Sequence, residues 1–280
     1  MNMASFRKKS ITLGVVYVLV VIALIVICFP LLWVLLSSLK PIDEITTRIP
    51  RLFPTRISLE HYKELFKTDF FKWYQNSTVV AFSTTFIVIF FSTMGAYSIS
   101  RFRFKTRNLM SSGVLLIYMF PSILLVIPLF LLLSKLRLTD NRLGLIFTYI
   151  TFSLPYCLWL MIAFFKSIPT QLEEAALVDG ATRLGALIHI IIPLALPGII
   201  SSGIFTFILC WNEYLFALIL ISSESLKTLP VGVTTFIGPT SVFWGLVLSA
   251  TMLMTFPVLI LFMFIQKQLI TGISAGAIKG

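Results

Sequence analysis

Acidic residues gather in the segment of residues 166–193, KSIPTQLEEAALVDGATRLGALIHIIIP, where Glu173, Glu174 and Asp179 outnumber two basic side chains. Carboxylates concentrated on one compact segment are suited to pairing with Arg or Lys side chains in a partner's cleft. The alternative is an amphipathic connector that lies on lipid, but such connectors are usually rich in Lys and Arg. We therefore expect this segment to form a docking surface for a basic partner.

The same segment carries the signals of two short helices. Thr170, with Glu173 three residues later, predicts a capping box at the start of the first helix. Gly180 supplies a position able to take a left-handed turn and end that helix. Thr182 can cap a second helix, which we expect to end at Pro193. The pattern predicts helix, glycine break and helix at a membrane surface.

Glu213 is the one charged residue inside its apolar block, and Asn212 adjoins it. A buried ionisable group in a membrane helix is a functional candidate, because its desolvation must be compensated. A structural hydrogen bond to a neighbouring helix would compensate it equally well. At about 16 residues, or roughly 24 Å, beyond Pro197, it is expected in the outer half of its span. Asn76, near the start of another apolar block, joins Asn212 and Glu213 as a candidate for a substrate path.

Residue patterns for catalysis or nucleotide binding are missing from the sequence. The motif GxxxxGK[ST] does not occur, nor does any Gly-Lys pair, so a phosphate-binding loop of that kind is excluded. His61 and His189 form no metal pattern, and the three cysteines lie within apolar blocks without CxxC spacing. There is no cluster of nucleophile and base. We expect no enzyme activity and no cofactor in this chain.

Composition indicates which elements must hold these residues. Of 280 residues, 58% are hydrophobic and 12% charged, and the mean hydropathy is +0.99. Soluble domains have about a quarter of their residues charged, so a secreted enzyme, a nucleic-acid-binding domain and a disordered regulator are excluded. The net charge of +11 is explained by Lys and Arg in the loops of a membrane protein. The expected surroundings are a lipid bilayer, with no nucleic acid.

Six apolar blocks are each long enough to cross about 30 Å of hydrocarbon as a helix. The first is too long for a cleaved signal peptide. The predicted fold is all-α: a polytopic membrane protein with a single transmembrane domain over residues 1–280. A cytoplasmic loop, residues 166–193, separates the fourth and fifth helices. The six spans are expected at about 10–39, 73–100, 108–134, 143–165, 194–221 and 242–266.

Basic residues near the helix ends indicate the orientation. With both termini inside, the 22 Lys and Arg residues divide equally between the two sides. Purely basic clusters at residues 7–9 and in RFRFKTR, residues 101–107, break the tie, because density near helix ends matters more than totals. The loop of residues 40–72 mixes bases with acids. We expect both termini in the cytoplasm, in a cell (inner) membrane.

The docking segment also resembles a known family. Its residue spacing is similar to that of the EAA loop of ABC-importer permeases. In both, EAA is followed by three residues and Gly, then by nine residues and Ile, and then by Pro. The matching residues are Glu174, Ala175, Ala176, Gly180, Ile190 and Pro193. One departure is Ile192, where the family most often has Leu. Four further stretches, MFPS with IPLF, WNEYLFAL, LPVGVTTFIGPTSVFWG and TGISAGAIKG, resemble the smaller permease subunit of maltose- and trehalose-type sugar importers.

The resemblance implies a permease that forms half of a sugar path and couples it to ATP hydrolysis by a separate protein. The implied partners are a second homologous permease, a cytoplasmic ATPase dimer that binds ATP and Mg, and an external sugar-binding protein, which the 222–241 loop would reach. The implied ATPase-coupling residues are Glu173, Glu174, Ala175, Ala176, Asp179 and Gly180. The implied tail contacts with the ATPase are Gly272, Gly276, Lys279 and Gly280.

Two other functions stay open at this point. An ion-coupled secondary transporter would need several intramembrane carboxylates, whereas Glu213 stands alone in the apolar blocks. A permease for an anion such as a glycerol phosphate would favour Arg or Lys within the spans, and the sequence has none there. The partner permease could still hold the whole binding site. Which sugar is carried, and whether this subunit touches it, do not follow from the sequence.

Overall fold

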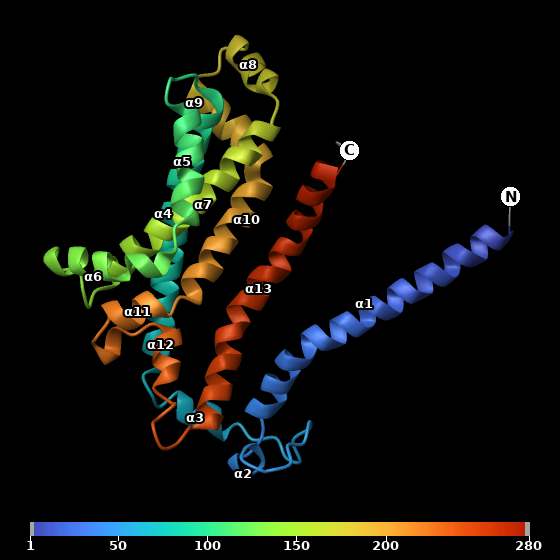
Figure 1. The fold of residues 1–280 in the computed structure, drawn as a ribbon, viewed down its shortest axis with the longest axis vertical. Helices are drawn as coiled ribbons and strands as arrows, with labels where there is room; N and C mark the ends of the chain where they lie inside the picture. Colours follow the sequence, from blue (N-terminus) through green and yellow to red (C-terminus); the bar gives the residue numbers. More distant parts are fainter. Residues whose placement is uncertain (1–2, 278–280) are drawn as a thin grey trace. The chain divides into compact units, whose positions relative to one another are not determined.

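The computed structural model describes residues 3–277, with side chains for residues 13–264, and its fold is all-α, as predicted (Figure 1). Besides its helices, this range contains one isolated bridge, between Ile237 and Val242. The α-helices are α1 Met3–Ser38, α2 Ile42–Ile45, α3 Glu60–Leu65, α4 Phe70–Arg101, α5 Arg107–Met119, α6 Val126–Lys135, α7 Arg142–Ser167, α8 Thr170–Val178, α9 Arg183–Ala186, α10 Ile192–Trp211, α11 Leu215–Leu220, α12 Leu229–Thr234 and α13 Trp244–Ala277. Two 3-10 turns, η1 Ser122–Leu125 and η3 Glu224–Leu226, and one π-helical turn, η2 Leu187–Ile191, complete the order.

Several of these helices can cross a membrane. Five in the described range are long and apolar enough: Leu13–Ser38, Phe70–Arg101, Arg142–Ser167, Arg183–Trp211 and Trp244–Phe264. A sixth candidate is a pair bent by 87°, made of α5 and the stretch that runs through η1 and α6. The predicted spans are therefore found as five helices and one bent pair.

Two predicted spans are not single helices. The one expected over residues 108–134 breaks between α5 and η1, where Phe120 is extended. Pro121 follows it, and the ring of a proline disfavours helical geometry in the residue before it. The one expected over residues 194–221 ends at Trp211 and resumes as α11, leaving a short break that contains Glu213.

The prediction that the second short helix ends at Pro193 is wrong. From Arg183 to Trp211, α9, η2 and α10 run on as one continuous helix. In η2 the Ile192 N–H bonds to the Leu187 carbonyl, one residue further back than in an α-helix. This wider turn comes directly before Pro193, which has no N–H to donate, and the chain continues past the proline.

Residues 69–234, together with α13 from Met254 onward, form one compact unit. Within it, α4, α7 and α10 pack against one another (Figure 1). Small residues allow the close approach, as is usual between membrane helices. Gly198 of α10 lies against the Phe164 ring of α7, and Gly203 of α10 lies against Ile89 of α4.

The two ends of this unit carry different loops. The loop after α4 and helix α8 share one end, where Arg101 forms an ion pair with Glu173. The start of α4, the loop before α7 and the loop after α11 share the other end, joined by hydrogen bonds of Asn76 and Asp140. Loops that alternate between two ends in this way are what a chain threading back and forth across a membrane requires.

Residues 3–68 and 235–253 belong to a second unit. The end of α1 is tied to α3, because Ser38 Oγ lies 2.7 Å from the Tyr62 hydroxyl and His61 Nε2 lies 3.1 Å from the Lys40 carbonyl. Along α1, the side chains from Leu13 to Leu32 are exposed and mostly apolar. A helix of this kind suits a position against lipid or another subunit.

Gly198→Ala should destabilise the protein, because the added methyl group would overlap the Phe164 ring and push α10 away from α7. Overpacking of this kind costs about 1–3 kcal/mol, measured as a lower unfolding midpoint in detergent. Gly113→Ala is the matched control, since its Cβ would meet no atom within 4 Å, and alanine gains about 1 kcal/mol of helix propensity. Equal midpoints for the two variants would contradict the close packing of α7 and α10.

Candidate functional site

Helix α8 has two different faces. Glu173 and Ala176 are buried, whereas Glu174 and Ala175 are exposed, and so is Asp179 directly after the helix. The docking residues predicted from the sequence are thus divided between the two faces. Glu174, Ala175 and Asp179 are available to a partner, while Glu173 and Ala176 face the protein.

Glu173 is held by one hydrogen bond and one ion pair from α4. The Tyr97 hydroxyl donates to Oε1 at 2.6 Å, and Arg101 Nε lies 3.1 Å from Oε2. Arg101 also donates through Nη2 to the Ile168 carbonyl at 3.0 Å, just before α8. The predicted capping box is wrong, because Thr170 is the first helical residue and the cap position is Pro169, which makes no side-chain capping bond. Glu173 is engaged by α4 instead.

The end of α8 is a left-handed glycine turn, as predicted. Gly180 has φ of +90°, a conformation that side-chain-bearing residues rarely adopt. Its N–H bonds to the Leu177 carbonyl at 3.2 Å, and the Ala181 N–H bonds to the Ala176 carbonyl at 2.9 Å, the pair that defines a Schellman motif. Thr182 then caps α9, accepting from the Gly185 N–H at 3.1 Å, which confirms its predicted role.

The predicted tail contacts lie at the end of the described chain. Gly272 and Gly276 fall within α13, beyond the last residue whose side chain is described. Lys279 and Gly280 lie outside the described residues.

Glu213 lies in the break between α10 and α11. There its carboxylate accepts from backbone N–H groups that would donate to carbonyl oxygens in a continuous helix. Oε1 accepts from the Phe216 N–H at 2.8 Å, and Oε2 accepts from the Ala217 N–H at 3.1 Å. Oε2 also accepts from the Tyr149 hydroxyl of α7 at 2.7 Å. The hydrogen bond to a neighbouring helix, which the sequence left as an alternative, is therefore present.

The same carboxylate also borders open space. A cavity of about 330 Å³ lies beside the bend between α5 and η1. Its wall includes Tyr118, Phe120, Thr151, Phe152, Glu213 and Phe216. Glu213 thus has a structural role and a place on a cavity surface at once.

The two asparagines proposed with Glu213 have other surroundings. Asn76 is buried, and its amide donates to the Ser225 and Lys227 carbonyls at 2.9 and 2.8 Å. Asn212 is exposed and donates to the Ile208 carbonyl at 2.9 Å. Neither is among the described residues that line the cavity beside Glu213. Asn76 fastens the loop after α11 to the start of α4.

Asp140 is a second anchor of that loop, and the sequence reasoning missed it. Its Oδ1 accepts from the backbone N–H groups of Ser222 and Ser223 at 3.0 and 2.8 Å, and its Oδ2 accepts from the Ser223 hydroxyl at 2.5 Å. These bonds, that of the hydroxyl above all, hold the pKa of Asp140 below its usual value. Asp140 has a positive φ of 52°. Asp tolerates this conformation better than most residues. The sequence TDN at residues 139–141 could therefore have indicated a turn here.

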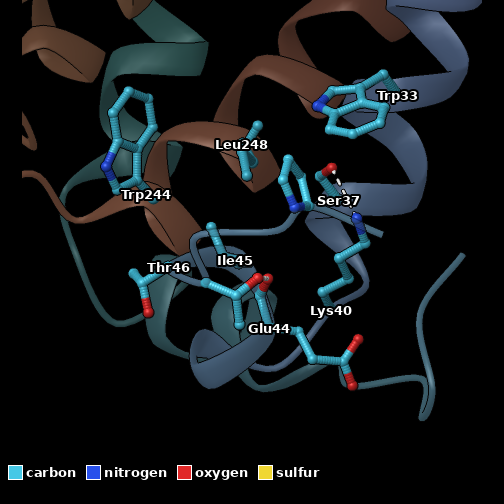
Figure 2. A pocket seen from close by; sticks show the side chains of 10 residues that line it. Trp33, Ser37, Lys40, Glu44, Ile45, Thr46, Trp244 and Leu248 are labelled. Atoms are coloured by element: carbon cyan, nitrogen blue, oxygen red, sulfur yellow. Dashed lines mark hydrogen bonds between the residues drawn. The ribbon is translucent and has the colours of Figure 1, made fainter. Parts of the chain in front are cut away.

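A cavity of about 440 Å³ lies in the unit of residues 3–68 and 235–253, and Figure 2 shows the side chains that line it. Trp33, Lys40, Glu44 and Trp244 are among its lining residues. The buried Lys40 ammonium lies 5.0 Å from the centre of the Trp33 ring and donates to the Arg51 carbonyl at 2.5 Å. From the sequence, Lys40 was counted only among the charges of the loop of residues 40–72. Its place in a cavity could not be predicted, because Trp33 and Trp244 are far apart in the sequence and only the fold brings them to the same cavity.

These features define a multi-pass membrane protein with a surface helix at one end, and comparison with known proteins gives its family. The family model described as binding-protein-dependent transport system inner membrane component matches residues 88–275. The chain therefore belongs to this family, whose members are transport permeases and not enzymes.

Individual proteins agree with this membership. The inner membrane ABC transporter permease protein YcjP of Escherichia coli is 36% identical, covering 92% of this chain and 93% of its own length. The trehalose transport system permease protein SugB of Mycobacterium tuberculosis is also 36% identical, covering 90% and 92%. The crystal structure of a bacterial ABC transporter that imports the acidic polysaccharide alginate contains a chain that aligns with a TM-score of 0.80 at 26% identity, covering 93% of this chain and 97% of that chain. The resemblance to ABC-importer permeases is confirmed.

Acid should release the loop after α11. Because the pKa of Asp140 is lowered in the folded protein, its bonds contribute stability that is full above the ordinary carboxyl pKa and lost as pH falls through the lowered value. Hydrogen-exchange protection of the Ser222 and Ser223 amides, corrected for intrinsic rates, should fall over that range. Asp140→Ala, which removes the accepting oxygens, should show low protection already at neutral pH, whereas Asp43→Ala, in another loop, should not. Full protection in Asp140→Ala would contradict the anchoring role.

Proposed function

We propose that this chain is a permease subunit of a sugar importer that is driven by a separate ATPase. It forms half of the path together with a second homologous permease and receives sugar from an external binding protein. The observation that carries the proposal is the exposed face of α8 with Glu174, on a helix that is anchored from its other face. Family membership supports it, as do relatives named as trehalose and trehalose/maltose permeases.

The exposed face of α8 and the turn that follows it have the chemistry of a docking site. Glu174 and Asp179 supply carboxylates for basic groups of the ATPase. Apolar side chains lie exposed around them: Leu172 (44%), Val178 (87%) and Leu184 (61%). Exposed apolar groups beside charges, outside the predicted spans, favour a protein partner that covers them.

Close approach of the ATPase depends on small residues. Ala175 is exposed, and Gly180 turns the chain without a side chain in the way. Ala176 instead packs inward, so its small size serves the contact of α8 with its own chain. ATP and Mg are bound by the ATPase, and Gly272, Gly276, Lys279 and Gly280 make a second contact with it.

The orientation follows from the loops that share an end of the unit. The basic loop RFRFKTR begins at Arg101, which pairs with Glu173 of α8. Because basic loops favour the cytoplasmic side, the proposal assigns α8 to that side, and the basic cluster at residues 7–9, with an even number of spans, supports the same side for both termini. The opposite loop, residues 222–241, is then outside and contacts the sugar-binding protein.

The cavity beside Glu213 is the part of the sugar path that this chain contributes. Aromatic rings can stack on the C–H faces of a sugar, and a carboxylate can accept its hydroxyls. None of the described residues that line this cavity is Lys or Arg, which favours a neutral sugar over a glycerol phosphate. Membership in a binding-protein-dependent family disfavours the ion-coupled alternative.

Glu174→Ala should disconnect the ATPase from the permease. Loss of a charged hydrogen bond weakens an interaction by about tenfold to a hundredfold, so hydrolysis stimulated by sugar-loaded binding protein should fall by that factor. The measurement uses the complete complex in proteoliposomes. Glu60→Ala is the control, because it removes an exposed carboxylate from α3. Stimulation in Glu174→Ala equal to that of the control would contradict the proposal.

A further inference from the structure

We propose that Tyr97 and Arg101 are positioning residues for coupling. Together with Glu173 they form a buried lock that makes α8 move with α4, so that force applied to Glu174 reaches a membrane span. This inference rests on the proposed function, because it assumes that the ATPase pulls on α8. The inference goes beyond the proposed function because it identifies the contact that joins the docking face of α8 to a membrane span.

The lock connects parts of the chain that are far apart in sequence. Each oxygen of the Glu173 carboxylate has its own partner on α4, the Tyr97 hydroxyl for one and the Arg101 guanidinium for the other. The side chains of Arg101 and Glu173 are only 5% and 7% exposed, so water hardly screens their ion pair. The bond from Arg101 to the Ile168 carbonyl adds the end of α7 to the same lock.

The other inward contacts of α8 are small. Its buried residues are Glu173 and Ala176, and Leu177 is half-buried. A methyl group and part of one leucine cannot hold a helix of nine residues firmly by apolar burial. The backbone of α8 packs against α9 and η2, and long side chains span the distance to α4. The attachment of α8 to α4 therefore depends mainly on the ion pair and the tyrosine bond.

The lock also sets which side of α8 faces the partner. Successive residues in a helix are rotated by about 100°, so a carboxylate fixed inward at Glu173 turns the next one, Glu174, outward. Without the lock, the helix could pivot between the Ile168–Pro169 segment and the Gly180 turn. The ATPase would still bind Glu174, but its movement would turn α8 without moving α4.

The lock consists of buried charged and polar side chains, which are not the best choice if the contact serves only to stabilise the fold. A buried ion pair is often no more stabilising than apolar side chains of the same volume, because both charges must leave water. What the contacts provide is geometry, since the Tyr97 hydrogen bond on one oxygen and the Arg101 ion pair on the other favour one orientation of the carboxylate. The lock therefore suits a joint that must transmit movement.

The test compares sugar transported per ATP hydrolysed, measured only on complexes that still contain the ATPase. Arg101→Gln should lower this ratio by about fivefold or more, while hydrolysis itself continues. Tyr97→Phe, which removes one hydroxyl and keeps the ring, should lower it less. Arg103→Gln, which removes an exposed charge from the same loop, is the matched control and should match wild type.

The outcomes separate this inference from the proposed function. An unchanged ratio in assembled Arg101→Gln complexes overturns the lock and leaves the docking proposal intact. If Arg101→Gln does not assemble, Tyr97→Phe decides, because an unchanged ratio there means that the contact only supports folding. If wild type itself shows no stimulation by sugar-loaded binding protein, the proposed function fails, and the lock fails with it.

Discussion

The structure depends on one constraint: lipid offers no hydrogen bonds to a peptide backbone. Spans must therefore be helices, and each interruption needs a substitute partner. Glu213 supplies that partner where α10 stops and α11 begins, accepting two backbone N–H groups with one carboxylate. At Pro193 the chain changes to a π-helical turn instead and continues. The carboxylate of Glu213 is therefore explained first by the backbone N–H groups that it accepts. The break that leaves these groups free for Glu213 also brings its side chain to a cavity wall.

Apolar blocks predicted the helical spans well, because block length and charge decide whether a segment can cross a membrane. The breaks were harder, since a proline either ends a helix or is accommodated depending on tertiary packing. Pro121 marks a sharp bend, whereas Pro193 does not. The left-handed turn at Gly180 was correctly predicted, because a positive φ depends mainly on the residue itself and glycine adopts it readily. The role of Glu173 was predicted wrongly, because a capping box is judged from local sequence, whereas the Tyr97 hydroxyl and the Arg101 charge that engage Glu173 lie on α4.

Helix α8 shows how adjacent carboxylates take different tasks. Glu173 is taken inward by Arg101 and Tyr97, and Glu174 is left exposed one residue later. Sequence alone gives both residues the same chemistry, and only the helix rotation against α4 distinguishes them. The same arrangement connects the exposed face of α8 to the membrane span α4. In the function that we propose, this connection is the link between an ATPase and a transport path.

The most direct test of this account is the accessibility of Val178, the most exposed apolar residue of α8. In a Cys28→Ala background, whose other two cysteines are buried, Val178→Cys would be treated with a membrane-impermeant maleimide. The account predicts labelling in inside-out vesicles, protection when the ATPase is bound, and no labelling of intact cells. Thr47→Cys, in the loop of residues 40–72, should show the reverse sidedness if the proposed orientation is correct. Labelling of Val178→Cys from outside, or labelling unaffected by bound ATPase, would contradict the assignment of α8 as the coupling helix.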